Sequence, residues 1–106
     1  MITAEFYLRD ETFAGFAVKG HAGFAEFGSD VVCAAVTSAV ELTANAITEI
    51  LKVDAAVGSF ENEVRLMLPE SGNNMEAVHF LQALRLHLEL LSEDYREYLR
   101  LIDTEI

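Results

Sequence analysis

A single cysteine, Cys33, occurs among the 106 residues, which excludes an internal disulfide and a zinc site built from several thiolates. No uninterrupted run of about 20 apolar residues is present, so a membrane-spanning helix is not expected. The opening residues, MITAEFYLRDE, lack the basic start and long apolar run of a secretory signal. These absences lead us to expect a cytoplasmic protein with no membrane partner.

Basic residues are also scarce. The chain has 7 Lys and Arg but 18 Asp and Glu, which gives a net charge of −11. Phosphate backbones are bound by clusters of basic side chains, and the seven here are scattered along the chain, so we expect no direct nucleic-acid binding. An acidic surface suits a basic partner protein, although solubility alone would explain the same charge. The hydrophobic content of 52% is ample for one core and argues against disorder. We therefore expect a single domain, residues 1–106.

Two hydrophobic periodicities alternate along the chain. The segment ITAEFYLR has an apolar residue at every second position, which is typical of a half-buried strand, and Val32, Val36 and Val40 recur at helical spacing. On these patterns we expect strands at 2–9, 13–19, 54–60 and 63–68, helices at about 31–52 and 75–91, and a last strand at 98–106, where a short helical turn is the alternative. The order ββαββα(β) predicts an α+β two-layer sandwich, with a mainly antiparallel sheet of about five strands and two helices on one face.

The stretch GHAGFAEFGSDVVC, residues 20–33, carries the residue types that chemistry would need. Cys33 falls in the first turn of the predicted helix, where unpaired amides and the positive end of the helix dipole stabilise a thiolate. A buried, inert packing cysteine is the alternative reading. His21 lies between glycines at the end of the second strand, and histidine can take a proton from a thiol and later return it to a leaving amine. The alternative for His21 is an ordinary histidine on a surface loop.

Asp30 and the two aromatic residues of the loop also have two readings each. Asp30 is an N-cap of the helix or, in addition, a third catalytic member that orients His21. Phe24 and Phe27 either pack in a fixed place or form a lid that closes over an apolar peptide, with the loop glycines as hinges.

Other combinations of reactive residues carry less weight. Glu76-x-x-His79 has the spacing of a di-iron bundle motif, but a second copy and further glutamates are missing. No phosphate-binding loop, dinucleotide fingerprint or zinc spacing occurs. We expect neither a cofactor nor a metal.

The residues Gly20-His21-Ala22-Gly23 followed by Asp30-Val31-Val32-Cys33-Ala34 resemble the signature of the ribosomal-processing cysteine protease family, Prp. The family pattern is GHA, a glycine-rich and acidic loop, then D-apolar-apolar-C-A and, shortly after, a serine. The spacing from histidine to cysteine matches, and the likeness extends over the whole chain. Thr37 stands where the family has its serine, a departure that keeps a hydroxyl group.

The resemblance implies a cytoplasmic cysteine endopeptidase that removes a short N-terminal extension from a large-subunit ribosomal protein, cutting after a pair of phenylalanines. It implies that His21 and Cys33 are the catalytic dyad, with Asp30 and Thr37 as supporting candidates. The protein partner is then a ribosomal protein precursor. A non-catalytic ribosome-assembly module, binding a basic partner and using Cys33 only for packing, is the alternative function. Because open sheet edges would otherwise stay uncovered, we also expect a homodimer.

Overall fold

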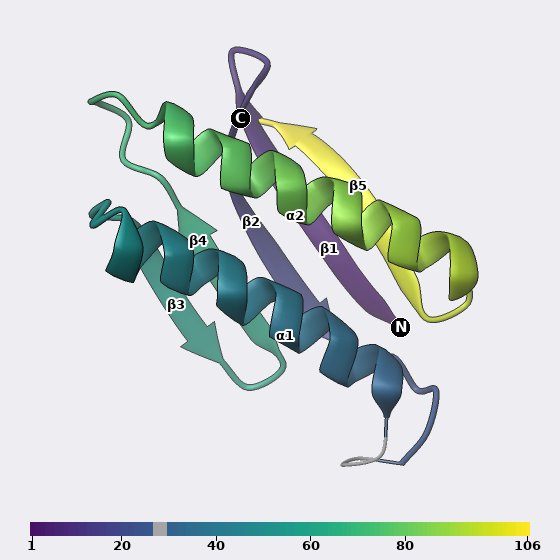
Figure 1. The fold of residues 1–106 in the computed structure, drawn as a ribbon. Coiled ribbons are helices and arrows are strands. Elements are labelled where there is room, and N and C mark those ends of the chain that lie inside the picture. Colours follow the sequence, from purple (N-terminus) through teal and green to yellow (C-terminus); the bar gives the residue numbers. More distant parts are fainter. Residues whose placement is uncertain (27–29) are drawn as a thin grey trace.

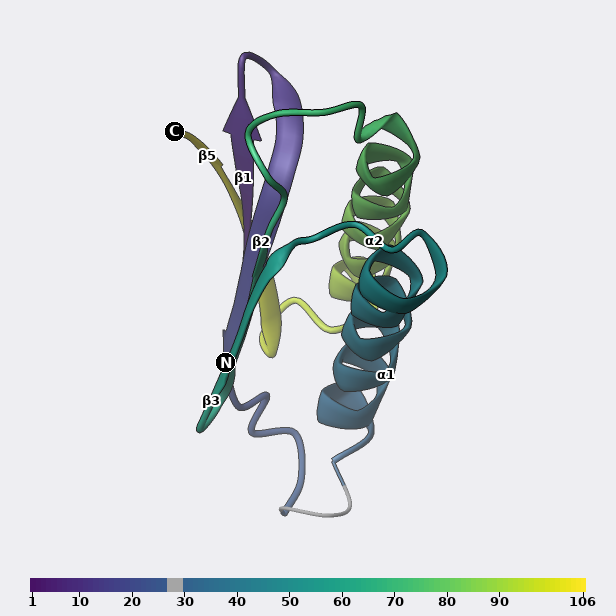
Figure 2. The ribbon, with the colours of Figure 1, turned by 90° about the vertical axis from the view of Figure 1, so that its left-hand side faces the viewer.

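A computed structural model describes residues 1–26 and 30–106 and arranges them in two layers (Figure 1). Figure 2 shows both helices on the same face of a five-stranded sheet, which confirms the predicted α+β sandwich. The elements in chain order are β1 (Ile2–Arg9), β2 (Thr12–Gly20), α1 (Val31–Asn45), the π-helical continuation η1 (Ala46–Ile50), β3 (Ala56–Phe60), β4 (Glu63–Met67), α2 (Met75–Asp94) and β5 (Leu99–Glu105).

The sheet has the order β3-β4-β2-β1-β5. Three of its strand pairs are antiparallel, and β5 runs parallel to β1, with Ile2 opposite Leu99 and Phe6 opposite Asp103. The last segment is therefore a strand, as preferred from the sequence. Its parallel direction follows from α2, which carries the chain back along the sheet before β5 begins (Figure 1). Period-two alternation does not reveal which neighbour a strand will pair with, so this pairing was not foreseen.

The core lies between the sheet and the helices. Ile2, Ala4 and Phe6 alternate inward from β1 and are buried, which is the burial that their period-two spacing predicts. The largest completely enclosed side chains come from both layers: Phe6, Phe16, Ile47, Leu66, Leu81, Leu88, Leu99 and Val32. Burial of apolar surface on this scale is the main force holding the helices on the sheet.

The helical stretch Val31–Ile50 is long and apolar enough, by length and composition alone, to cross a membrane, with a mean hydropathy of 1.5. Core helices of globular folds meet the same criteria, so the finding is weak support for a membrane span. In this fold Val32, Val36 and Val40 are buried on the inner face of α1. The apolar character of the helix thus serves its packing on the sheet.

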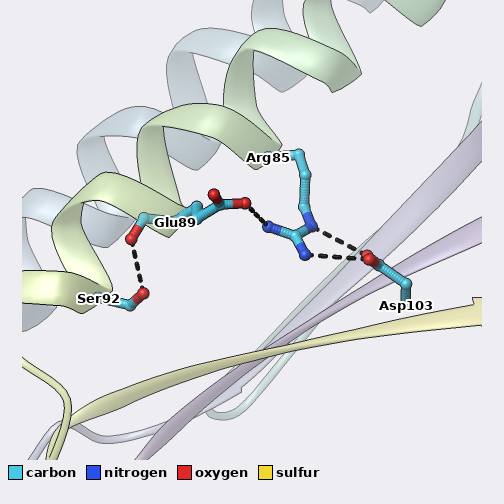
Figure 3. A network of polar contacts seen from close by, with 4 residues as sticks. All are labelled: Arg85, Glu89, Ser92 and Asp103. Carbon is cyan, nitrogen blue, oxygen red and sulfur yellow. Dashed lines mark hydrogen bonds and ion pairs between the residues drawn. The ribbon is translucent and has the colours of Figure 1, made fainter.

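An arginine ties α2 to the edge strand β5 (Figure 3). Arg85 Nε and Nη2 donate to the two carboxylate oxygens of Asp103 at 2.9 and 3.0 Å, and Nη1 donates to Glu89 at 2.7 Å. The guanidinium group also lies 5.9 Å from the ring centroid of Phe6. A forked pair of this geometry fixes direction as well as distance, so it holds the parallel strand β5 in register under α2.

Candidate active site

Gly20 ends β2 and turns the chain into the loop that carries His21. Its φ of +97° is a conformation that side chains with a Cβ rarely adopt, and a Cβ here would lie 2.5 Å from the carbonyl oxygen of Met1. The Gly20 amide donates to the carbonyl oxygen of Asn62 at 2.8 Å, which ties the strand end to the turn between β3 and β4. His21 therefore starts from a fixed point at the end of the central strand β2.

Asp30 is the N-cap of α1, and its two carboxylate oxygens serve two different segments. Oδ1 accepts from the amides of Val32 and Cys33, each at 3.0 Å, which caps the first turn. Oδ2 accepts from the amides of Phe24 at 3.0 Å and Ala25 at 3.3 Å. The N-cap reading is thus confirmed. The second oxygen fastens the loop to the start of the helix.

Cys33 lies half-buried in the first turn of α1, where the sequence had placed it. Its Sγ accepts a hydrogen bond from the amide of Ala22 at 3.3 Å. The sulfur therefore has a backbone donor directly beside the start of the helix. His21 immediately precedes Ala22 and is exposed, so the loop that supplies the amide to the sulfur also carries the histidine.

His21 and Cys33 line one cavity of about 680 Å³ between α1 and the sheet. The volume is in the range of ligand-binding clefts. The cavity wall comes from four parts of the chain. Strands β1 and β2 contribute Ile2 and Val18, and the end of β2 with the following loop contributes Gly20, His21, Gly23 and Ala25. The other residues are Asp30, Cys33, Ala34, Val36, Thr37, Val40 and Glu41 from α1 and its cap, and Phe60, Asn62, Glu63 and Val64 from the β3–β4 hairpin. A nucleophile and a proton acceptor beside a largely apolar cleft can cleave an acyl bond of an apolar peptide.

The other predicted site residues are distributed around this cavity. Thr37 lines it one turn beyond Cys33. Phe24 does not line it, although its neighbours Gly23 and Ala25 do, and its ring packs edge-on against Tyr95 and Tyr98 with centroids 5.6 and 5.2 Å away. Phe27 lies outside the described residues.

Hydrogen bonds set the ionisation of Asp30. The amide of Cys33 has the largest effect and lowers the pKa of the Asp30 carboxyl below its ordinary value. Burial opposes it, and the amides of Ala25, Phe24 and Val32 lower the pKa further. A depressed folded-state pKa means that ionised Asp30 stabilises the fold above the unfolded pKa of about 3.9. This stabilisation is lost as the pH falls through the lower, folded-state pKa.

Asp30→Ser is expected to separate the two roles of this side chain. Serine caps helices about as well as aspartate, so α1 keeps its cap, while the amides of Phe24 and Ala25 lose their acceptor. We expect kcat for peptide cleavage to fall by up to about 10²-fold, because the loop that carries His21 loses its anchor and a reacting group misplaced by about 1 Å reduces the rate on this scale. The melting temperature should also fall. Its difference from the wild type should narrow as the pH falls below about 4, where Asp30 is protonated first in the unfolded chain and then, at its lower folded-state pKa, in the fold. Unchanged activity, or a pH-independent difference in melting temperature, would contradict the anchoring role.

Comparison with known proteins decides the family of this chain. The sequence model of the family described as cysteine protease Prp matches residues 1–100. The chain belongs to the cysteine protease Prp family. The sequence left open a cysteine protease and a non-catalytic ribosome-assembly module. Membership of this family supports the cysteine protease.

Several Prp proteins resemble the chain over nearly its whole length. Ribosomal processing cysteine protease Prp of Staphylococcus aureus (strain Mu50 / ATCC 700699) is 29% identical over 103 residues, which are 95% of this chain and 97% of that protein. The Prp of Bacillus subtilis (strain 168) is 30% identical over 96 residues, or 86% of each chain.

Solved Prp structures have the same fold. An essential ribosomal processing protease Prp from S. aureus, crystallised with a covalently linked product peptide, superimposes with a TM-score of 0.91 at 27% identity, covering 98% of this chain and all of that one. The same protease with a substrate peptide gives a TM-score of 0.85 at 26% identity, with the same coverage.

Sequence reasoning missed the parts of the cavity and its surroundings that come from distant segments. Asn62, Phe60 and Val64 enter the cavity from the β3–β4 hairpin, and no local pattern connects that hairpin with Cys33. Tyr95 and Tyr98, the supports of Phe24, lie more than 70 residues from it along the chain. Glu41 could have been found, because it is eight residues after Cys33 on the same predicted helix.

Proposed function

We propose that this chain is an endopeptidase that removes a short N-terminal extension from a large-subunit ribosomal protein, with Cys33 as nucleophile and His21 as general base and acid. The observation that carries the proposal is the cavity that His21 and Cys33 share. In it the Cys33 sulfur accepts a hydrogen bond from the amide of Ala22, the residue after His21. The relatives named ribosomal processing cysteine proteases support the choice of substrate class.

The proposed reaction has two stages. His21 accepts the thiol proton while Sγ bonds to the scissile carbonyl carbon, and the protonated imidazole then returns that proton to the departing amine as the peptide bond breaks. A thioester between Cys33 and the extension remains. Water activated by His21 attacks this thioester, releasing the extension as a carboxylic acid and regenerating the thiol.

The cavity lining supports a cut next to large apolar side chains, and we propose cleavage after a pair of phenylalanines. Its apolar wall consists of Ile2, Val18, Val36, Val40, Phe60 and Val64. We also place the reaction in the cytoplasm, where thioredoxin and glutathione keep a lone catalytic thiol reduced. Incubation of the enzyme with a peptide that contains a Phe-Phe-Ala junction tests the proposal, since the masses of the products identify the bond that is cut.

The lid remains a proposal for the loop. Phe24 now packs on Tyr95 and Tyr98, so closure over a peptide requires its ring to leave this contact. We expect amide hydrogen exchange in residues 22–29 to slow when an uncleavable substrate peptide binds to Cys33→Ala. Amides already protected in the free enzyme, with no change on binding, would rule out a lid.

We further propose a homodimer. Large apolar side chains are exposed on the outer faces of both helices, among them Leu42 at 73% and Leu86 at 57%. A second copy would cover such side chains. Sedimentation equilibrium at micromolar concentration should give twice the chain mass of 11.7 kDa, and a clean mass of 11.7 kDa would show this proposal to be wrong.

A further inference from the structure

A row of three polar side chains runs along the cavity side of α1. Cys33, Thr37 and Glu41 lie at intervals of four residues, and all three line the cavity. Residues four apart share a helix face. With a rise of about 1.5 Å per residue, Glu41 lies roughly 12 Å along the helix axis from Cys33. A substrate chain extended in the cleft advances about 3.3 Å per residue, so this distance corresponds to three or four substrate residues.

Glu41 differs from the other two carboxylates of the cavity, because its side chain has no hydrogen-bond or ion-pair partner among the described residues. Asp30 holds four backbone amides, and Glu63 is paired with Arg65 at 3.0 Å. Over residues 1–26 and 30–106, no hydrogen bond or ion pair engages the side chain of Glu41, which is exposed at the cavity wall.

The charge lining the cavity has one sign. Asp30, Glu41 and Glu63 are among its lining residues, and no Lys or Arg is, within the part of the chain that the structure describes. A cleft lined by one sign of charge raises the local concentration of ligands of the opposite sign. A free carboxylate in such a cleft is matched by an ammonium or guanidinium group.

From these observations we propose that Glu41 is a specificity residue that selects peptides with a Lys or Arg three or four residues from the scissile bond. The inference rests on the proposed function, because it takes the cavity as the peptide-binding cleft and Cys33 as its nucleophile. The apolar wall near Cys33 then receives the residues at the cut, and Glu41 receives the basic residue two helical turns away.

The test compares peptides that are identical except for a single Lys or Gln placed three or four residues before or after the Phe-Phe-Ala junction. For the wild type we expect kcat/KM to be about two- to fivefold higher with Lys than with Gln at one of these positions, the effect of a solvent-accessible ion pair. The preference should shrink at about 1 M salt because exposed charges are screened. In Glu41→Gln the two peptides should be cleaved at equal rates, and Glu41→Lys should favour a Glu-containing peptide.

Glu49→Gln is the matched control. Glu49 is the other acidic residue of the helical stretch Val31–Ile50, lies in its continuation η1, and does not line the cavity. It should keep the full Lys preference. Equal cleavage of the Lys and Gln peptides by the wild type, or a Lys preference that persists in Glu41→Gln, would overturn the inference while leaving the protease function standing. Failure to cleave any of the peptides would instead refute the proposed function, and the inference would fall with it.

Discussion

Replacing Cys33 with alanine is expected to abolish peptide cleavage, with a loss on the order of 10⁶ in kcat, as for removal of the nucleophile of a serine protease. The physical reason is that no other side chain of the cavity can form the covalent intermediate in its place. Thr37 is one turn away and carries an unactivated hydroxyl, which is a weak nucleophile at neutral pH. The measurement is single-turnover cleavage of a peptide with a Phe-Phe-Ala junction, with the products detected by mass spectrometry.

Two controls distinguish loss of chemistry from loss of structure. Cys33 is half-buried, so Cys33→Ala should lower the melting temperature only modestly and should still bind the peptide. Ser38→Ala, on the exposed side of the same helix and away from the cavity, should keep wild-type activity. Cleavage by Cys33→Ala at near the wild-type rate, with only stability reduced, would mean that the cysteine serves packing.

Replacing His21 with alanine is expected to lower kcat by about 10²–10⁴-fold, the contribution of a general acid–base group. The melting temperature should barely change, because the imidazole is exposed and no core contact depends on it. KM should change less than kcat, since proton transfer is needed in the transition state and not for binding.

His79→Ala is the matched control for this variant. His79 is also exposed, but it lies on α2 and does not line the cavity. Its replacement should leave kcat and KM unchanged. A large loss of stability in His21→Ala together with retained activity would instead assign His21 a structural role.

Local chemistry explains which features could be anticipated from the sequence. The position of Cys33 followed from a capping aspartate and valines at helical spacing, both of which depend on residues close in sequence. The strand positions followed from alternation of the same local kind. The placement of His21 beside the helix start followed from the order of elements, since a short loop joins the end of β2 to α1.

Features that depend on contacts between distant segments were not available from the sequence. The alternation of 98–106 predicts a strand, but its parallel pairing with β1 depends on how α2 packs. If Asp30 had a role beyond the N-cap, the sequence suggested that it orients His21, but its second carboxylate oxygen accepts from the amides of Phe24 and Ala25. Backbone donors in an irregular loop have no sequence signature, so this anchor could be seen only in three dimensions.

The most direct test of a cysteine endopeptidase built on His21 and Cys33 is the intact mass of the protein during turnover of a Phe-Phe-Ala peptide. We expect two peptide products from one cut after the second phenylalanine. We also expect a transient protein species that carries the N-terminal fragment as a thioester at Cys33, heavier than the free protein by the mass of that fragment less one water. With Cys33→Ala the peptide should stay intact and no adduct should form. An intact peptide with the wild type, or products that form equally well in the absence of the Cys33 thiol, would contradict this mechanism.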